Sequence, residues 1–233
     1  MQHHINYNIK LPKELIKQYG NTTDKTIPVL SYLYFHATPE KYIYTSIDCI
    51  CSELNLSTKS HGARRSQNII KEILKHLIDN NVISLMVIDE CINIDNLNNG
   101  QLFKLSLNLS SDWINPQSNY VYIDITEYQT IINNNKHACK AFNVYCNIKS
   151  YICMDDDCLH ICYPSIKTLC NICGCSDNTL SSIIKILYDN KLLFLYKFNE
   201  YEKIKINRNI EYVFALTDYS RKQILNEFII EKK

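Results

Sequence analysis

The chain has 233 residues, a formal net charge of +1 at pH 7, and a composition that is 46% hydrophobic and 21% charged. These values predict a packed globular protein with room for two domains, and they exclude a protein that coats nucleic acid through its overall charge. No apolar run approaches the about 20 residues that cross a bilayer, and the first residues lack the pattern of a signal peptide, so we expect a cytoplasmic protein with no membrane partner.

The first half of the chain contains a predicted series of helices followed by a β-hairpin. Ser46 is a good N-cap residue for a short helix, and Ser57 ends the turn before a longer amphipathic helix. In chain order, the predicted elements are an extended opening at INYNIKL, a helical stretch, a second helix at about 27–37, the short helix SIDCICSELN, the long helix closing at DNN, and a hairpin of VISLMVIDECINI and QLFKLSLNL around the turn DNLNNG. This order is that of a winged helix.

The second half of the chain repeats the first. Residues 27–57 align without a gap with 146–176, and 73–85 align with 183–195. The identical pairs are Ser31/Ser150, Tyr32/Tyr151, Tyr44/Tyr163, Ser46/Ser165, Ile47/Ile166, Cys51/Cys170, Ser57/Ser176, Lys75/Lys185, Leu77/Leu187, Asp79/Asp189 and Asn80/Asn190. We therefore predict a tandem duplication in which copy one carries the insertion TKSHGARRS.

The duplication sets the predicted fold and the domain boundaries. The predicted elements of copy two are the extended opening YVYIDI, a second helix at about 141–153, the short helix SIKTLCNICG capped by Ser165, a third helix closing at DNK, and the strands LLFLYKF and EYVFALT. The predicted fold is α+β and mostly helical, with two tandem winged helix-turn-helix domains and a C-terminal helix. The predicted boundaries are domain 1 at 1–115, a linker at 116–119, domain 2 at 120–217 and the C-terminal helix at 218–233.

The eleven cysteines raise the question of a zinc site. In a helix-turn-helix, the second helix ends in an apolar residue, a residue tolerant of positive φ, a second apolar residue and a serine. These places are occupied by Cys173, Gly174, Cys175 and Ser176, and copy one has Leu54 and Leu56 where copy two has the two cysteines. We therefore predict that these cysteines are buried thiols that hold no metal. A metal site around Cys153, Cys158, His160 and Cys162 stays open. The case for this site is weaker because the aligned residues of copy one are Tyr34, Pro39, Lys41 and Ile43.

The third helix of copy one carries a predicted DNA-binding face. Its predicted buried stripe consists of Ile70, Ile73, Leu74 and Leu77, which leaves polar residues on another face. Arginine can bind guanine edges, Asn or Gln can bind adenine, and Lys can neutralise phosphate. Because the insertion contains Gly62, we expect a flexible loop that becomes ordered on DNA. The candidate DNA-binding residues of copy one are Lys59, His61, Arg64, Arg65, Gln67, Asn68, Lys71 and Lys75.

The corresponding face of copy two is less basic. It carries Asn178, Ser181, Ser182 and Lys185, with Asp177 and Asp189 nearby, so it offers little charge to attract a phosphate backbone. Its wing adds the candidate DNA-binding residues Lys203, Lys205 and Arg208, opposed by Glu200 and Glu202. The sequence leaves open whether copy two contacts DNA or a protein.

The two winged helices, with YPSIKTLCNICGCSDNTLSSIIKILYDNKLLFLYK as the clearest unit, resemble the tandem winged-helix replication initiator proteins of plasmids and phages. The resemblance covers most of the chain at the level of architecture, and its motifs are those of the winged helix-turn-helix superfamily generally. It implies a sequence-specific double-stranded DNA-binding protein that recognises origin repeats and recruits replication proteins. Each third helix would enter a major groove, about one helical turn apart.

The sequence contains no recognisable catalytic or cofactor-binding motif. The four glycines, at 20, 62, 100 and 174, cannot form a Walker A loop. His3 and His4 are adjacent, whereas rolling-circle nicking enzymes pair a His-x-His with a tyrosine. An acidic run at 155–157 is typical of a solvated turn, and copy one lacks it. We expect no enzyme activity, no cofactor and no metal.

Two alternative functions stay open. A transcription regulator would use the same DNA-reading mode at a promoter. A winged-helix protein-interaction module of a replisome or partition complex would bind a protein, and weak salt dependence of DNA binding would favour this alternative. The sequence also leaves open whether the chain forms a homodimer.

Overall fold

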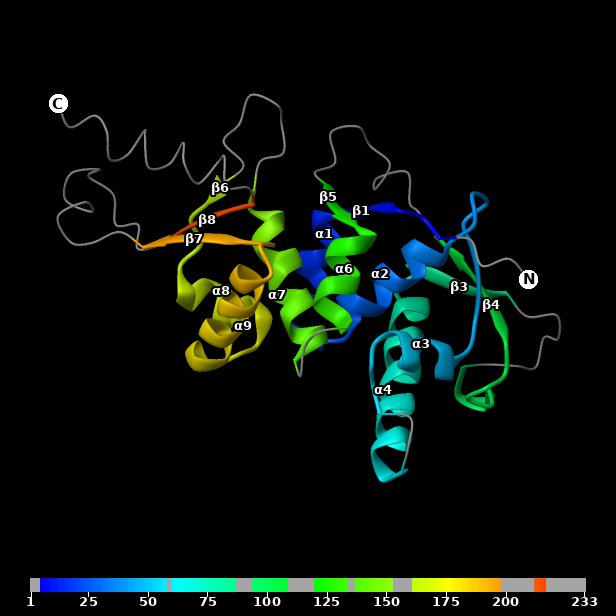
Figure 1. Cartoon of the computed structure of the whole chain (residues 1–233). Helices are drawn as coiled ribbons and strands as arrows, with labels where there is room; N and C mark the ends of the chain where they lie inside the picture. Colours follow the sequence, from blue (N-terminus) through cyan, green and yellow to red (C-terminus); the bar gives the residue numbers. More distant parts are fainter. Residues whose placement is uncertain are drawn as a thin grey trace, which may run out of the picture. The chain divides into compact units, whose positions relative to one another are not determined.

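The computed structural model describes residues 5–57, 60–86, 94–108, 120–133, 137–152, 161–197 and 212–216 (Figure 1). Outside these ranges lie the predicted linker and C-terminal helix, and also Lys59, Lys203, Lys205, Arg208, Cys153, Cys158 and His160. For residues 60–64, which include the candidates His61 and Arg64, the backbone alone is described.

The chain forms two compact units, and each unit takes two segments of the sequence. Unit 1 consists of Met1–Lys13 and Lys25–Cys139, and unit 2 consists of Glu14–Asp24 and Lys140–Lys233. This division differs from the domain boundaries predicted near 115 and 120, because the beginning of copy two groups with unit 1 and Glu14–Asp24 groups with unit 2.

Two interactions between segments that are distant in the sequence explain this exchange of segments. Strand β1 (Asn8–Pro12) pairs antiparallel with β5 (Tyr120–Asp124), which holds the beginning of copy two in unit 1. In unit 2, the buried Asn143 donates a hydrogen bond from Nδ2 to the carbonyl oxygen of Gly20 at 2.6 Å. A Cβ atom at Gly20 would lie 2.7 Å from the carbonyl oxygen of Ile16. The close approach of Gly20 to that carbonyl therefore requires glycine.

The described part of unit 1 contains four α-helices, a 3-10 helix and a three-stranded antiparallel sheet of order β2-β4-β3. The inward residues Ile43 and Leu105 face each other in this sheet and are fully buried. Beyond β1 and β5, the elements of unit 1 are α2 (Thr26–His36), β2 (Tyr42–Thr45), α3 (Ile47–Glu53), α4 (Ser60–Asp79), β3 (Ile83–Met86), the 3-10 helix η1 (Ile94–Asn96), β4 (Phe103–Leu107) and α6 (Ile125–Asn133).

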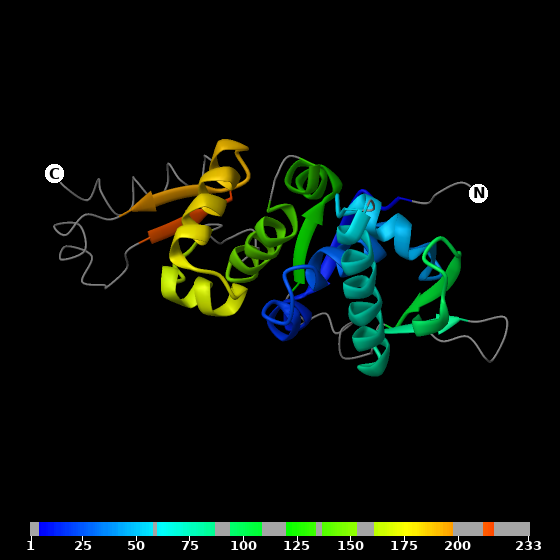
Figure 2. The same ribbon diagram turned by 90° about the horizontal axis from the view of Figure 1, so that it is seen from below.

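Unit 2 has the corresponding arrangement, with a sheet of order β6-β8-β7. In Figures 1 and 2, α8 and α9 lie side by side. The elements are α1 (Lys13–Tyr19, apart from its first residue), most of α7 (Ala138–Ser150), β6 (Ile161–Cys162), α8 (Ile166–Cys173), α9 (Asp177–Asp189), β7 (Phe194–Lys197) and β8 (Tyr212–Ala215).

The same order of elements occurs twice along the chain. Strand, helix, helix, strand, helix, helix, strand, strand runs from β1 to β4 and again from β5 to β8, with η1 added in the first copy. The predicted α+β, mostly helical fold is therefore confirmed. The strands β2 and β6 were not predicted, and each adds a third strand to its hairpin.

The serine caps and the turns between the paired helices follow the prediction. Ser46 accepts a hydrogen bond from the Cys49 backbone at 3.1 Å, and Ser165 accepts one from Thr168 at 3.0 Å. Gly174 ends α8 with φ of 57°. Because Asn55 has φ of 50° at the same place in copy one, both turns use the left-handed region.

The prediction of a flexible loop around Gly62 is wrong, because α4 already begins at Ser60. Residues 60–66 of the insertion therefore form helix and lengthen α4 to 20 residues, against 13 in α9. A single glycine costs a helix about 1 kcal/mol, and the good helix formers Ala63, Arg64 and Arg65 follow it. The first turns of α4 extend past α3 (Figure 1).

Replacing Gly174 with alanine should lower the free energy of unfolding by about 1–2 kcal/mol. No atom lies within 4 Å of an added Cβ, so this cost comes from the left-handed backbone and not from a clash. Gly174→Asn is the matched variant and should cost less, because asparagine tolerates this conformation, as Asn55 shows. Chemical denaturation of the full chain measures both effects. Equal stability of the alanine variant and the natural chain would contradict the cost assigned to the left-handed backbone at Gly174.

Candidate nucleic-acid interface

Helix α9 presents one apolar and one polar stripe. The apolar stripe packs into unit 2 and consists of Leu180, Ile183, Ile184 and Leu187, all buried. The predicted polar stripe is exposed as expected and consists of Asn178, Ser181, Ser182 and Lys185. Because the polar residues follow the spacing i, i+3, i+4, i+7, they form one continuous face opposite the core.

The polar face of α9 is open to a ligand within the part of unit 2 that the structure describes. Ser182 donates a hydrogen bond from Oγ to the carbonyl oxygen of Asn178, inside the same helix, at 2.9 Å. Among the described residues, no hydrogen bond or ion pair joins the four polar side chains to another element. The face is therefore a row of neutral hydrogen-bonding groups ending in one lysine.

Helix α4 also buries the predicted stripe of Ile70, Ile73, Leu74 and Leu77. Of the candidate DNA-binding residues on α4, Arg65, Asn68 and Lys75 are exposed, while Gln67 and Lys71 are half-buried. The same face contains the exposed acidic residue Glu72, one turn after Asn68, where copy two has Ser182. A carboxylate there repels phosphate, so the predicted basic face of α4 is less favourable than its lysines suggest.

Residues 94–101, called here the wing segment, dock onto α4 and α3. Lys71 donates from Nζ to the carbonyl oxygen of Leu97 at 2.7 Å, and Lys75 forms an exposed ion pair with Asp95 at 2.6 Å. The hydrogen bond and the charge of Asp95 raise the pKa of Lys75. Ile94 and Leu97 are buried, so the docking has an apolar part as well.

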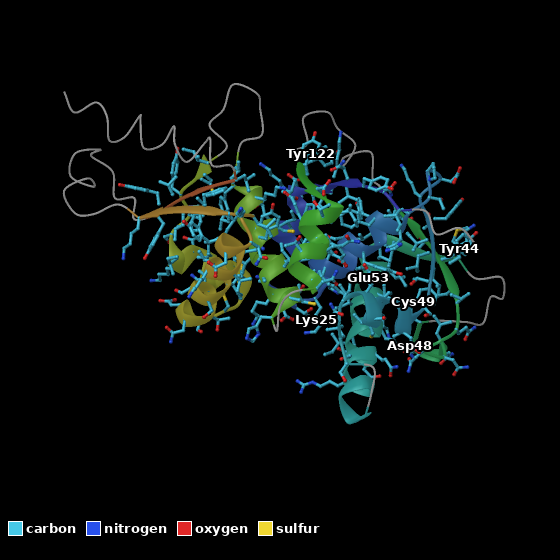
Figure 3. The ribbon with its side chains drawn as sticks, viewed as in Figure 1. Lys25, Tyr44, Asp48, Cys49, Glu53 and Tyr122 are labelled. Carbon is cyan, nitrogen blue, oxygen red and sulfur yellow. The ribbon has the colours of Figure 1, made fainter. Side chains whose placement is uncertain are left out.

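Helix α3 takes part in the same contacts. The backbone nitrogen of Asp48 donates to the carbonyl oxygen of Asn99 at 3.0 Å, and the Asp48 carboxylate accepts from Nε2 of Gln67 at 2.7 Å. Figure 3 shows Asp48 on α3, beside Cys49. Gln67, Lys71 and Lys75 therefore all have intramolecular partners, which a DNA phosphate or base would have to replace.

Several polar residues of this interface were missed by sequence reasoning. Asp48 and Asp95 matter through their contacts with α4, and no local pattern in the sequence indicates those contacts. Lys167 and Asn171 are exposed one turn apart on α8, and their i, i+4 spacing is a signal that could have been read. The first helix of a helix-turn-helix crosses the DNA backbone, so this spacing is relevant to phosphate contacts.

Two cysteines of the α8–α9 turn align with leucines, and the prediction of buried thiols is confirmed for Cys173, whereas Cys175 is half-buried. Cys173 is buried, and burial raises its pKa to about 12. Burial, followed by a hydrogen bond to Asp177, also raises the pKa of Cys170 to about 12. Within the described ranges, no group of three or more His, Cys, Asp or Glu side chains is arranged to hold a metal ion.

In the folded chain near pH 8, iodoacetamide should modify Cys49 well before Cys51, Cys170 and Cys173. Cys49 is exposed, whereas the other three thiols are buried, and their raised pKa values leave little thiolate to react. Mass spectrometry of the digested protein after short labelling times measures the order. Labelling in denaturant is the control, and it should abolish the difference in labelling rate between Cys49 and the other three cysteines. Rapid labelling of Cys173 in the folded chain would contradict the packing described above.

In the parts of the chain that are described, no helix combines the length and the apolar character needed to cross a membrane. Residues 140–193 match a protein family described as a helix-turn-helix domain. No curated protein matches the chain. The matched segment contains nearly all of α7 and the whole of α8 and α9, so the helix whose polar face is open lies inside the recognised helix-turn-helix domain.

Proposed function

We propose that the chain is a sequence-specific double-stranded DNA-binding protein, with a binding function and no catalytic activity. The observation that carries this proposal is the position of the exposed α9 face inside the matched helix-turn-helix segment, 140–193. In this motif the second helix of the pair lies in the major groove, where its exposed side chains meet base edges. In the proposed complex, Asn178, Ser181 and Ser182 meet bases.

In the proposed mode of binding, some residues position the protein on the phosphate backbone and others read the bases. Lys167 on α8 and Lys185 near the end of the α9 face are placed to neutralise phosphates on either side of the groove. In unit 1, Arg65 and Asn68 are the exposed residues that would contact DNA without first losing a described intramolecular hydrogen bond. In this mode, copy two contributes more to base recognition than its weak charge indicates. Copy one contacts DNA through the first half of α4.

For the biological role, we propose replication initiation at a plasmid or phage origin, as the resemblance to tandem winged-helix initiators implies. Two helix-turn-helix copies in one chain suit a site with two half-sites, which an origin repeat provides. A transcription regulator would use the same surfaces at a promoter. Replication proteins would be further partners in the first case.

Selection from random double-stranded DNA with the purified full chain tests the proposed DNA binding. We expect enrichment of a defined site with two half-sites about 10 base pairs apart, and an affinity that falls steeply between a low and a high salt concentration. Footprinting of that site in its own replicon then distinguishes an origin from a promoter. Failure to enrich any site at either salt concentration would contradict the proposal and favour the protein-interaction alternative.

Replacing Asp95 with asparagine should strengthen binding to the selected DNA and steepen its salt dependence. The change releases Lys75, and one additional phosphate contact adds about 0.9 to the slope of log K against log salt. Glu40→Gln is the matched control, because it removes one acidic charge from an exposed turn of the same unit. An equal change in both variants would assign the effect to net charge, and an unchanged slope in Asp95→Asn would contradict the masking of Lys75.

A further inference from the structure

We propose that Asn178 reads an adenine in the major groove, so that the half-site of unit 2 is defined by an A·T pair. The inference rests on the proposed DNA binding and names the base that this face recognises. Asn178 lies in the first turn of α9, directly after the cap Ser176 and Asp177, and its side chain is exposed. The first residues of a recognition helix are those that contact base edges.

The chemistry of the face favours adenine over guanine. A side-chain amide donates to N7 and accepts from N6 of adenine at the same time, a pairing that guanine cannot offer because its major-groove edge has two acceptors. The Asn178 amide has no hydrogen bond to another described element, so both of its ends are available. Arginine is the usual reader of guanine, and the matched segment 140–193 contains none.

The duplication supports the same residue independently. The alignment of 73–85 with 183–195, extended toward the N-terminus, places Asn68 opposite Asn178, and both are exposed. Their neighbours have diverged, with Lys71 opposite Ser181 and Glu72 opposite Ser182. An asparagine kept at the outward position of both third helices, while the surrounding charges changed, fits a shared contact with adenine.

The competing reading of this face is that Lys185 contacts a guanine, because lysine also binds guanine O6 and N7. Lys185 lies two turns further along α9 than Asn178. We therefore assign it to phosphate, and the experiment below distinguishes the two readings by the base that is preferred.

The test uses the full chain, the site obtained by selection, and single base-pair replacements along that site. The natural chain should prefer A·T at one position by about 5- to 150-fold, the range of a good bidentate contact. Asn178→Ala should remove the preference at that position alone, and Asn178→Arg should change it to G·C. Replacing the adenine with 7-deazaadenine, which lacks N7, should weaken the natural chain and leave Asn178→Ala unaffected.

Asn21→Ala is the matched control, because Asn21 is an exposed asparagine of unit 2 outside the helix-turn-helix segment, and it should keep every preference. If the natural chain selects a site and Asn178→Ala keeps all of its base preferences, the adenine contact is wrong while DNA binding stands. If a G·C preference is lost in Lys185→Ala and no A·T preference depends on Asn178, lysine reads the site instead. If the natural chain selects no site, the proposed function itself fails.

Discussion

The burial of one apolar stripe on each third helix is the constraint on which the candidate interface depends. In α9, the stripe begins at Leu180 and ends at Leu187, and its four side chains together contribute roughly 6–12 kcal/mol when they leave water. This is several times the net contribution of a typical hydrogen bond, about 1 kcal/mol, so packing fixes the rotation of the helix about its axis. The outward direction of Asn178 and Ser181 follows from packing and needs no contact of their own.

The two copies use this constraint differently. In copy two, the polar face of α9 meets no other described element, and its side chains are neutral apart from Lys185. In copy one, the wing segment docks on α4 and takes Lys71 and Lys75 as partners. Copy one is richer in basic residues, but side chains on the polar face of its third helix already have intramolecular partners. This contrast favours α9 as the main surface of the proposed interface, although charge alone would favour α4.

Much of the fold could be predicted because local rules and the duplication agree. Serine caps, the left-handed turn residue and the apolar stripe at helical spacing are all local signals, and each was present in both copies. The comparison of copies also predicted that Cys173 and Cys175 are buried thiols, because leucines stand opposite them, and this is confirmed for Cys173 while Cys175 is half-buried. Strands β2 and β6 were missed because a four-residue and a two-residue strand carry little periodicity.

The remaining differences come from contacts between distant segments. The pairing of β1 with β5 and the hydrogen bond from Asn143 to Gly20 exchange segments between the units, and neither leaves a pattern in the sequence nearby. The partners of Gln67, Lys71 and Lys75 were missed for the same reason. Helical spacing indicates which residues share a face, but only the folded chain shows what already contacts that face.

Backbone amide chemical shifts of the full chain, recorded by NMR before and after adding its selected double-stranded DNA, show which surface of the chain contacts DNA. If the polar face of α9 reads DNA, the largest changes fall within 177–185, on the first turns of α9, with smaller changes around Lys167 and Arg65. Changes that spare α9 and occur only in unit 1, or on the sheet of unit 2, would show that the open polar face is not the surface that reads DNA.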